Sequence, residues 1–175
     1  MRGARNGAAW LALAYRTTLP DAEALRIALG PGPDPGAFPR DVIEREAADL
    51  EALERLGARL VTIADAEYPR RLRGDEAPLL LQVAGRVSLL DAERVAFLAG
   101  ARGEPARRLA DVLDAGGRAV VVLSKGMLRA EGWLRALREP IDDGSLALVS
   151  AEPPRAGWGP LRDRRRDALL TKLSR

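Results

Sequence analysis

Residues 119–123 read Ala-Val-Val-Val-Leu, an unbroken apolar run that is rich in β-branched side chains. Such runs are typical of strands that are buried on both faces, as in the middle of a parallel sheet. A helical pattern at residues 104–115 precedes the run, with Pro105 near its first turn and Gly116 and Gly117 past its end. A helix that leads directly into a doubly buried strand predicts a βαβ unit and therefore an α/β fold.

Strand and helix patterns alternate along the chain from about residue 57, whereas the patterns before it are helical. Further strands are expected at residues 59–63, 79–83, 95–99 and 146–149, and further helices at residues 8–16, 21–29, 40–56, 128–138 and 161–174. We therefore predict two parts. Residues 1–57 form a small helical N-terminal unit, and residues 58–175 form a shortened Rossmann-like α/β domain with a mostly parallel sheet and flanking helices.

The composition excludes several kinds of chemistry, because the 175 residues include no cysteine and no histidine. Thiolate and imidazole metal sites and hydrolytic triads are therefore not expected. We expect no catalytic residue, no metal and no cofactor. Neither a membrane-spanning run nor a signal-peptide pattern is visible, so we expect a cytoplasmic protein with no membrane partner.

Positive charge is concentrated near the C-terminus. The net charge is +3, but residues 151–175 carry seven basic and three acidic side chains. The chain has 26 arginines and two lysines, and arginine binds phosphate through a planar fork of donors. A GC-rich genome also explains an arginine excess, so the bias alone does not identify a ligand.

A turn of small residues follows the strand expected at residues 95–99, which we take to be buried. Gly100, Ala101 and Arg102 stand between this strand and the next helix. In open α/β sheets anionic ligands bind at such turns, where backbone N–H groups of the helix point at the ligand. We therefore predict phosphate contact there. A plain strand-to-helix turn with a solvated arginine is the alternative.

Six segments of the chain, taken in order, carry a resemblance to a known family. They read Leu-Gly-Ala-Arg-Leu-Val-Thr-Ile at 56–63 with Asp65 and Tyr-Pro-Arg-Arg-Leu at 68–72, Pro-Leu-Leu-Leu-Gln-Val-Ala-Gly at 78–85, Val-Ala-Phe-Leu-Ala-Gly-Ala-Arg at 95–102, Leu-Asp-Ala-Gly-Gly-Arg-Ala-Val-Val-Val-Leu at 113–123, Leu-Val-Ser-Ala-Glu-Pro-Pro at 148–154, and Arg-Asp-Ala-Leu-Leu-Thr-Lys-Leu-Ser at 166–174. In these segments the chain resembles the DNA-processing protein A family (DprA, also called Smf).

The chain also departs from the family pattern. The family's Gly-Ser-Arg turn has Ala101 in place of its serine, and the long βα segment that follows this turn in the family is missing. In the C-terminal motif, Asp167 and Ala168 replace an asparagine and an arginine. The chain therefore resembles a shortened and diverged member.

The resemblance implies a non-enzymatic protein that binds single-stranded DNA and delivers it to a RecA-type recombinase in natural transformation. It implies nucleic-acid or phosphate binding at Gly100, Ala101, Arg102, Lys125, Gly126 and Arg166. A routine surface lysine and a solvated helix face are the alternatives for Lys125 and Arg166.

Because of the missing segment, we expect DNA binding to be weak or lost. Two other functions stay open: a sensor of a nucleotide-derived small ligand, and a degenerate interaction subunit that has lost ligand binding. Either a homodimer or a heteromer with a full-length paralogue is compatible with the sequence.

Overall fold

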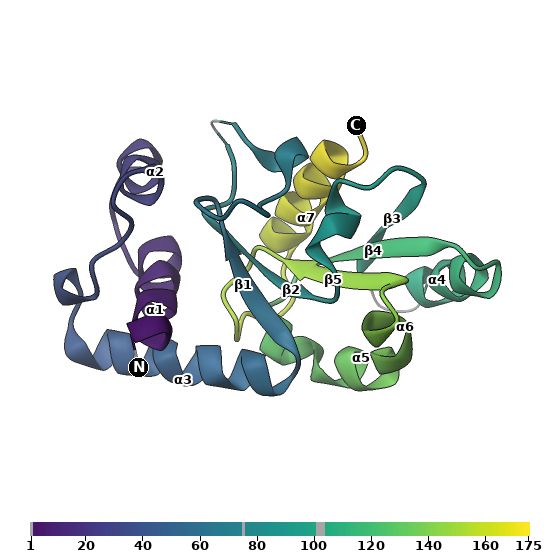
Figure 1. The fold of residues 1–175 in the computed structure, drawn as a ribbon, viewed down its shortest axis with the longest axis horizontal. Coiled ribbons are helices and arrows are strands. Elements are labelled where there is room, and N and C mark those ends of the chain that lie inside the picture. Colours follow the sequence, from purple (N-terminus) through teal and green to yellow (C-terminus); the bar gives the residue numbers. More distant parts are fainter. Residues whose placement is uncertain (1, 75, 101–103) are drawn as a thin grey trace.

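The structure, a computed structural model, describes residues 2–74, 76–100 and 104–175, with the side chains of residues 6–74, 76–100 and 107–175. Figure 1 shows its elements. The helices are α1 (Arg2–Tyr15), α2 (Asp21–Leu29), α3 (Arg40–Arg55), α4 (Glu104–Asp114), α5 (Glu131–Ala136), α6 (Arg138–Asp142) and α7 (Pro160–Leu173). The strands are β1 (Ala58–Thr62), β2 (Leu80–Ala84), β3 (Val95–Gly100), β4 (Arg118–Leu123) and β5 (Leu146–Ser150). Short 3-10 helices are η1 (Pro35–Ala37), η2 (Arg70–Leu72), η3 (Val87–Leu90) and η4 (Met127–Ala130).

The strands of the described chain form one sheet in the order β1-β2-β5-β4-β3. β3 pairs parallel with β4, and β4 pairs parallel with β5, whereas β2 lies antiparallel between β5 and β1. β1, β5, β4 and β3 therefore share one direction, and β2 runs the opposite way. The predicted α/β fold is confirmed, and the sheet is mostly parallel because only β2 is antiparallel to its neighbours. The carboxyl ends of the other four strands meet at one edge of the sheet.

Helices cover both faces of the sheet because its central strands are mostly apolar and buried on both faces. All of β5 is buried, and so is β4 after its first residue. Neighbouring side chains of β4 point to opposite faces. Val120 and Val122 pack in a core with Leu169 of α7, whereas Val121 packs in a second core with Leu134 of α5. Figure 1 shows α7 above the sheet and α5 and α6 below it.

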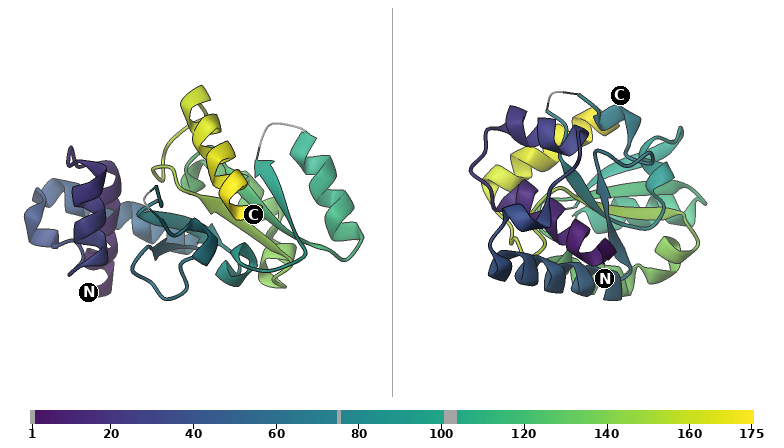
Figure 2. Two further views of the ribbon diagram at one scale, coloured as in Figure 1. Left: turned by 90° about the horizontal axis from the view of Figure 1, so that it is seen from above. Right: turned by 60° about the vertical axis from the view of Figure 1, so that its left-hand side comes forward.

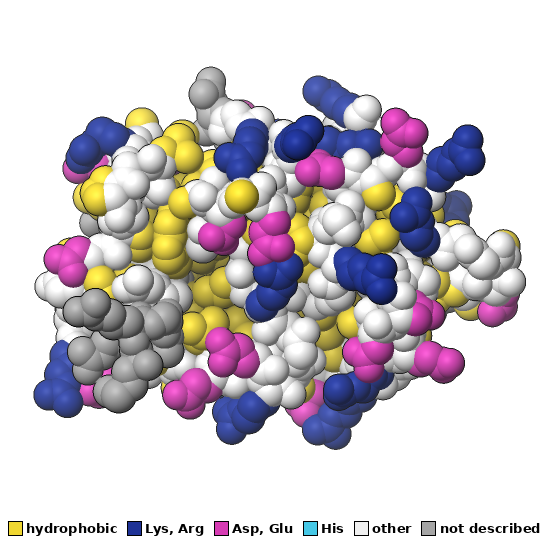
Figure 3. Space-filling model, viewed as in Figure 1, with side chains coloured by type: hydrophobic (Ala, Val, Ile, Leu, Met, Phe, Trp, Pro, Cys, Tyr) yellow, Lys and Arg dark blue, Asp and Glu magenta, His cyan; other side chains and the backbone are white. Residues whose placement is uncertain are grey.

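The three N-terminal helices lie at one end of the molecule (Figure 2). α1 packs against α3, and buried Leu11, Leu50 and Leu80 form a small core between α1, α3 and β2. Figure 3 shows hydrophobic side chains gathered between these helices and β1. Gly57, at φ +76°, turns the chain from α3 into β1, as a glycine after a helix predicts. The division into units at residues 1–57 and 58–175 stays a prediction.

The helix predicted at residues 128–138 is divided in the structure. It begins as η4, continues as α5, and is interrupted at Leu137, whose φ of −107° and ψ of 20° depart from helical values. Pro140 explains the break, because a proline ring inside a longer helix would clash with the carbonyl group of residue 136. In the first turn of α6, Pro140 removes no helical hydrogen bond.

β3 is an edge strand, so the expectation of a buried strand at residues 95–99 is wrong. β3 pairs with β4 along one side, and residues 95–99 are only half-buried. Among the described residues, no further strand lies beyond β3. A local apolar pattern does not distinguish an edge strand from a central one, because the strand order depends on pairing across the whole sheet. The turn after Gly100 therefore lies at the margin of the sheet.

Candidate functional site

The carboxyl ends of β3, β4 and β5 meet at one edge, and α7 contacts both β3 and β4 there. We call this region the carboxyl edge; it consists of Gly100, residues 123–126, residues 150–152, Arg162, Arg165 and Arg166. Four of the six predicted site residues lie in it, namely Gly100, Lys125, Gly126 and Arg166. The other two, Ala101 and Arg102, lie outside the described residues.

The structure brings Arg166 and Gly100 together across 66 positions of sequence. Arg166 Nη1 lies 3.5 Å from the Gly100 carbonyl oxygen, and the arginine side chain is 11% exposed. The same guanidinium group pairs with Asp163 at 3.1 Å and with Asp167 at 2.8 Å. Arg166 therefore holds α7 over the end of β3, and two carboxylates already compensate its charge.

Both glycines of the predicted site are required by packing within the protein. A Cβ atom on Gly100 would lie 2.6 Å from Leu123 Cδ2 and 3.0 Å from the Val122 carbonyl oxygen. A Cβ atom on Gly126 would collide with the carbonyl groups of Pro153 and Pro154. Gly100 thus lets β3 approach β4, and Gly126 lets the loop after β4 approach the loop after β5.

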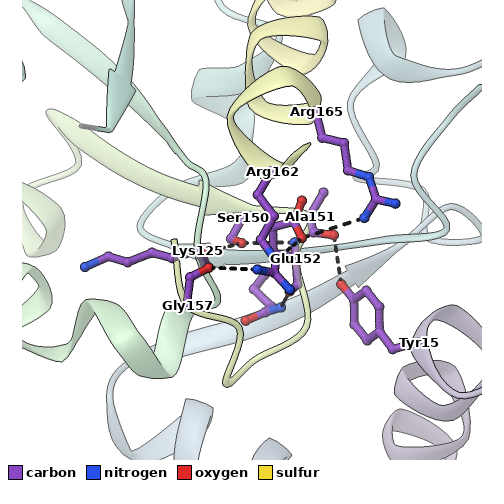
Figure 4. A network of polar contacts seen from close by, with 9 residues as sticks. Tyr15, Lys125, Ser150, Ala151, Glu152, Gly157, Arg162 and Arg165 are labelled. Carbon is purple, nitrogen blue, oxygen red and sulfur yellow. Dashed lines mark hydrogen bonds and ion pairs between the residues drawn. The ribbon is translucent and has the colours of Figure 1, made fainter. Parts of the chain in front are cut away.

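Lys125 points into the protein rather than toward the arginines of α7 (Figure 4). Its side chain is buried, its Nζ donates a hydrogen bond to the Arg129 carbonyl oxygen at 2.9 Å, and Nζ lies 5.2 Å from the centroid of the Trp158 ring. Its backbone oxygen accepts a hydrogen bond from Ser150 Oγ at 2.8 Å. Lys125 therefore ties η4 and the loop after β5 to the end of β4. Its burial corrects the alternative of a routine surface lysine.

A buried carboxylate, Glu152, forms the centre of the carboxyl edge (Figure 4). It is 3% exposed, and two arginines of α7 reach it: Arg162 Nε lies 3.2 Å from Glu152 Oε2 and Arg165 Nη1 lies 3.8 Å from the same atom. The Arg162 and Arg165 side chains are 36% and 64% exposed. Glu152 therefore positions two guanidinium groups whose outer donors remain accessible to solvent. Glu152 lies in the family-like segment at 148–154 but was not predicted as a site residue.

Two further polar side chains, one buried and one half-buried, fix the segment that carries Glu152. Gln82 of β2 donates a hydrogen bond to the Glu152 carbonyl oxygen and accepts one from the Met127 N–H at 3.1 Å. Tyr15 of α1 donates a hydrogen bond to the Ala151 carbonyl oxygen at 3.1 Å. Burial raises the pKa of the Tyr15 hydroxyl far above its ordinary value, so this donor keeps its proton. The N-terminal helices thereby anchor the carboxyl edge.

The carboxyl edge opens into a groove of about 410 Å³ between α7 and α2, which we call the edge groove. Leu79, Leu123 and Leu169 contribute apolar lining. The charged lining consists of three cations, Arg165, Arg166 and Lys172, and three carboxylates, Asp21, Glu76 and Glu152. The formal charges of the lining therefore cancel. The wall formed by α2 and residues 76–79 was not predicted, because no local motif marks it.

The carboxyl edge can bind an anion, but carboxylates of the protein compete with the anion for the arginines. Each of Arg162, Arg165 and Arg166 already has a carboxylate partner, so a phosphate group must share or displace that partner. No group of three or more acidic side chains in the described part of the chain is arranged to hold a metal ion. None of the described helices is both long and apolar enough to cross a membrane.

Comparison with known proteins identifies a similar fold. No protein-family model matches the chain, and no curated protein matches its sequence. Among solved structures, the X-ray structure of DNA processing protein A (DprA) from Streptococcus pneumoniae aligns with a TM-score of 0.52. The alignment covers 97% of this chain and 70% of that chain, at 17% sequence identity. This similarity shows that the chain has a Rossmann-like α/β fold of the kind found in DprA.

Proposed function

We propose that this protein is a non-enzymatic, DprA-like protein that binds single-stranded DNA weakly at its carboxyl edge. The observation that carries the proposal is the position of Arg162, Arg165 and Arg166, which α7 holds where β3, β4 and β5 end. Guanidinium groups bind phosphate oxygens through two parallel hydrogen bonds. The similarity to the fold of DprA supports the proposal at the level of architecture.

The ion pairs of the carboxyl edge support weak rather than tight binding. Arg165 is 64% exposed and lies 3.8 Å from Glu152, so one side of its guanidinium group remains available. Arg164, the neighbouring exposed arginine of α7, makes no ion pair with any described residue. A phosphodiester strand would contact these outer donors while Glu152 keeps its inner contacts. Such binding depends mainly on charge and weakens as salt rises.

The absence of catalysis is part of the proposal and draws on the sequence, which lacks histidine and cysteine. By resemblance to the DprA family, the proposal extends to delivery of the bound strand to a RecA-type recombinase during DNA uptake. This extension requires strand binding first. The first experiment therefore measures strand binding by the purified protein.

The test uses two charge-matched variants, Arg165→Glu at the carboxyl edge and Arg138→Glu on α6. Arg138 is exposed, pairs with Asp142 at 3.3 Å, and lies just before β5, at the opposite edge of the sheet. Fluorescence anisotropy with a labelled oligo-dT at low salt gives the dissociation constants. We expect Arg165→Glu to raise the constant about tenfold and Arg138→Glu to change it less than about twofold, since exposed charges beyond a Debye length are screened.

Three results would contradict the proposal. The first is no binding of the oligonucleotide by the wild-type protein at low salt. The second is an equal loss in both variants, which would mean that net charge alone drives binding. The third is saturable stabilisation by a mononucleotide without DNA binding, which would support the nucleotide-sensor alternative instead.

A further inference from the structure

A second groove, of about 670 Å³, lies beside η2 and η3 and shares no lining residue with the edge groove. We call it the η2–η3 groove. Four of its lining residues are arginines, namely Arg59, Arg70, Arg71 and Arg86, and two are acidic, Glu67 and Asp91. These arginines come from three separate places in the chain, and none of them was predicted as a site residue.

Both carboxylates of the η2–η3 groove are already occupied. Glu67 forms a two-fold contact with the guanidinium group of Arg59, which holds the pKa of Glu67 below its ordinary value. Asp91 accepts hydrogen bonds from the backbone N–H groups of Arg70 at 2.9 Å and Arg71 at 3.3 Å. Neither carboxylate therefore forms an ion pair with the side chains of Arg70 or Arg71.

Neutral carbonyl groups hold two of the remaining arginines in place. Arg71 Nη1 donates to the Leu173 carbonyl oxygen at 2.7 Å, and Arg86 Nη2 donates to the Asp143 carbonyl oxygen at 3.2 Å. Arg71 also lies over the ring of Phe97, with 5.9 Å from Cζ to the ring centroid. A carbonyl acceptor orients a guanidinium group but leaves its full positive charge uncompensated. Because these guanidinium groups are already oriented, less side-chain conformational entropy is lost when a ligand binds.

The third of these arginines, Arg70, is exposed, and its side chain makes no hydrogen bond or ion pair with the described residues. The side chains of Arg70, Arg71 and Arg86 thus form no close ion pair with a described carboxylate, although Asp143 lies near enough to Arg86 that this arginine, after the hydrogen bonds from Ser145, helps to lower the pKa of Asp143. Ser88 adds an exposed hydroxyl group to the lining, and buried Tyr68 and Val87 provide apolar lining. Planar donors with uncompensated charge around one groove match the oxygens of phosphate groups.

We propose that the η2–η3 groove is a second phosphate-binding site, in which Arg70, Arg71 and Arg86 bind the phosphate groups of a nucleotide or of a nucleic-acid strand. The site is separate from the carboxyl edge and does not depend on the function proposed for that edge. The shared chemistry is a phosphate oxygen in contact with guanidinium donors. A comparison of ligands decides whether the bound phosphate belongs to a nucleotide or to a nucleic-acid strand.

The experiment measures the binding of inorganic pyrophosphate to the full chain by isothermal titration calorimetry at low salt. Arg70→Glu is the principal variant, because the Arg70 side chain has no partner whose loss would disturb the fold. Arg86→Ala is the second variant, and Arg138→Glu on α6 is the charge-matched control. We expect pyrophosphate binding to weaken about tenfold or more in Arg70→Glu and about fivefold in Arg86→Ala, as expected for the loss of a charge-assisted contact. The control should bind like the wild type.

Two further ligands then distinguish the sources. If Arg70→Glu weakens ADP binding as much as pyrophosphate binding but leaves oligo-dT binding unchanged, the groove is a nucleotide site. An oligo-dT whose affinity falls in Arg70→Glu identifies a strand-binding site. No pyrophosphate binding by the wild-type protein, or equal binding by wild type and Arg70→Glu, would overturn the proposal. An oligo-dT affinity that falls in Arg165→Glu but not in Arg70→Glu would leave the proposed function of the carboxyl edge intact, so the two proposals can fail separately.

Discussion

The edge groove and the η2–η3 groove both contain arginines, but they hold the guanidinium groups with different partners. At the carboxyl edge, Arg162 and Arg165 pair with the buried carboxylate Glu152, and Arg166 pairs with two aspartates. In the η2–η3 groove, Arg71 and Arg86 are held by backbone carbonyl groups. A carboxylate both orients and neutralises an arginine, whereas a carbonyl group only orients it.

This difference means that a count of basic residues does not identify the stronger anion site. The sequence directs attention to the basic C-terminal segment, yet the lining of the edge groove has no net formal charge. The η2–η3 groove has a net formal charge of +2 from four arginines and two acids. We therefore expect the η2–η3 groove to bind small phosphates better, and the carboxyl edge to require the many contacts of a strand.

The largest effect is expected from Gly126→Ala, which tests whether the carboxyl edge is a tightly packed framework. The backbone of Gly126, at φ −63°, suits any residue, so the cost is steric and comes from the carbonyl groups of Pro153 and Pro154. We expect a loss of up to about 3 kcal/mol in the free energy of unfolding, measured with urea.

Gly132→Ala in α5 is the matched control, because its added Cβ would meet no atom within 4 Å apart from its chain neighbours and the backbone of its own helix. This substitution should leave the protein as stable or raise its stability by up to about 1 kcal/mol, since alanine favours a helix. Equal stability of Gly126→Ala and the wild type would mean that the two loops at the carboxyl edge are free to move apart. The carboxyl edge would then not be the tightly packed framework described above.

A smaller effect is expected from Glu152→Gln, which removes the carboxylate that competes with phosphate. The glutamine keeps the shape of the side chain, while Arg162 and Arg165 lose a negative partner. A phosphate group would bind on the solvent-exposed side of the guanidinium groups, where a unit charge about 4 Å away contributes about 1 kcal/mol, so we expect the dissociation constant for oligo-dT to fall about fivefold.

The control for Glu152→Gln is pyrophosphate binding in the η2–η3 groove, which should not change. Anisotropy and calorimetry on the same preparation provide both measurements. Weaker oligonucleotide binding in Glu152→Gln would show that Glu152 serves chiefly to position the arginines, and the competition described for the carboxyl edge would be contradicted.

The strand positions could be predicted from the sequence because each strand is a short apolar run ended by a turn residue. The run at residues 119–123 became β4, and Gly57 took the left-handed conformation expected after α3. The neighbours of each strand could not be predicted in this way. β3 has a strand-like sequence, but its place at the edge of the sheet depends on the order of pairing rather than on its own residues.

The candidate sites were less predictable than the fold, because they join residues that are distant in sequence. Arg166 meets Gly100 across 66 positions, and Arg71 reaches the Leu173 carbonyl oxygen across 102 positions. Lys125 suggests a surface side chain in a loop, yet it is buried. The η2–η3 groove was not predicted, because the family-like segment that contains Arg59, Arg70 and Arg71 carries no phosphate-binding motif, and Arg86 lies outside this segment. Gly100, Lys125, Gly126 and Arg166 stay predictions as ligand contacts, together with Ala101 and Arg102.

The most direct test of the contrast between the grooves is an NMR titration that follows the arginine Nε–Hε signals as inorganic pyrophosphate is added at low salt. Single arginine substitutions assign the signals of Arg70, Arg86, Arg165 and Arg166. The signals of Arg70 and Arg86 should shift at lower pyrophosphate concentrations than those of Arg165 and Arg166, because neither Arg70 nor Arg86 forms a close ion pair with a described carboxylate. Earlier shifts of Arg165 and Arg166, or equal shifts of all four signals, would contradict the account.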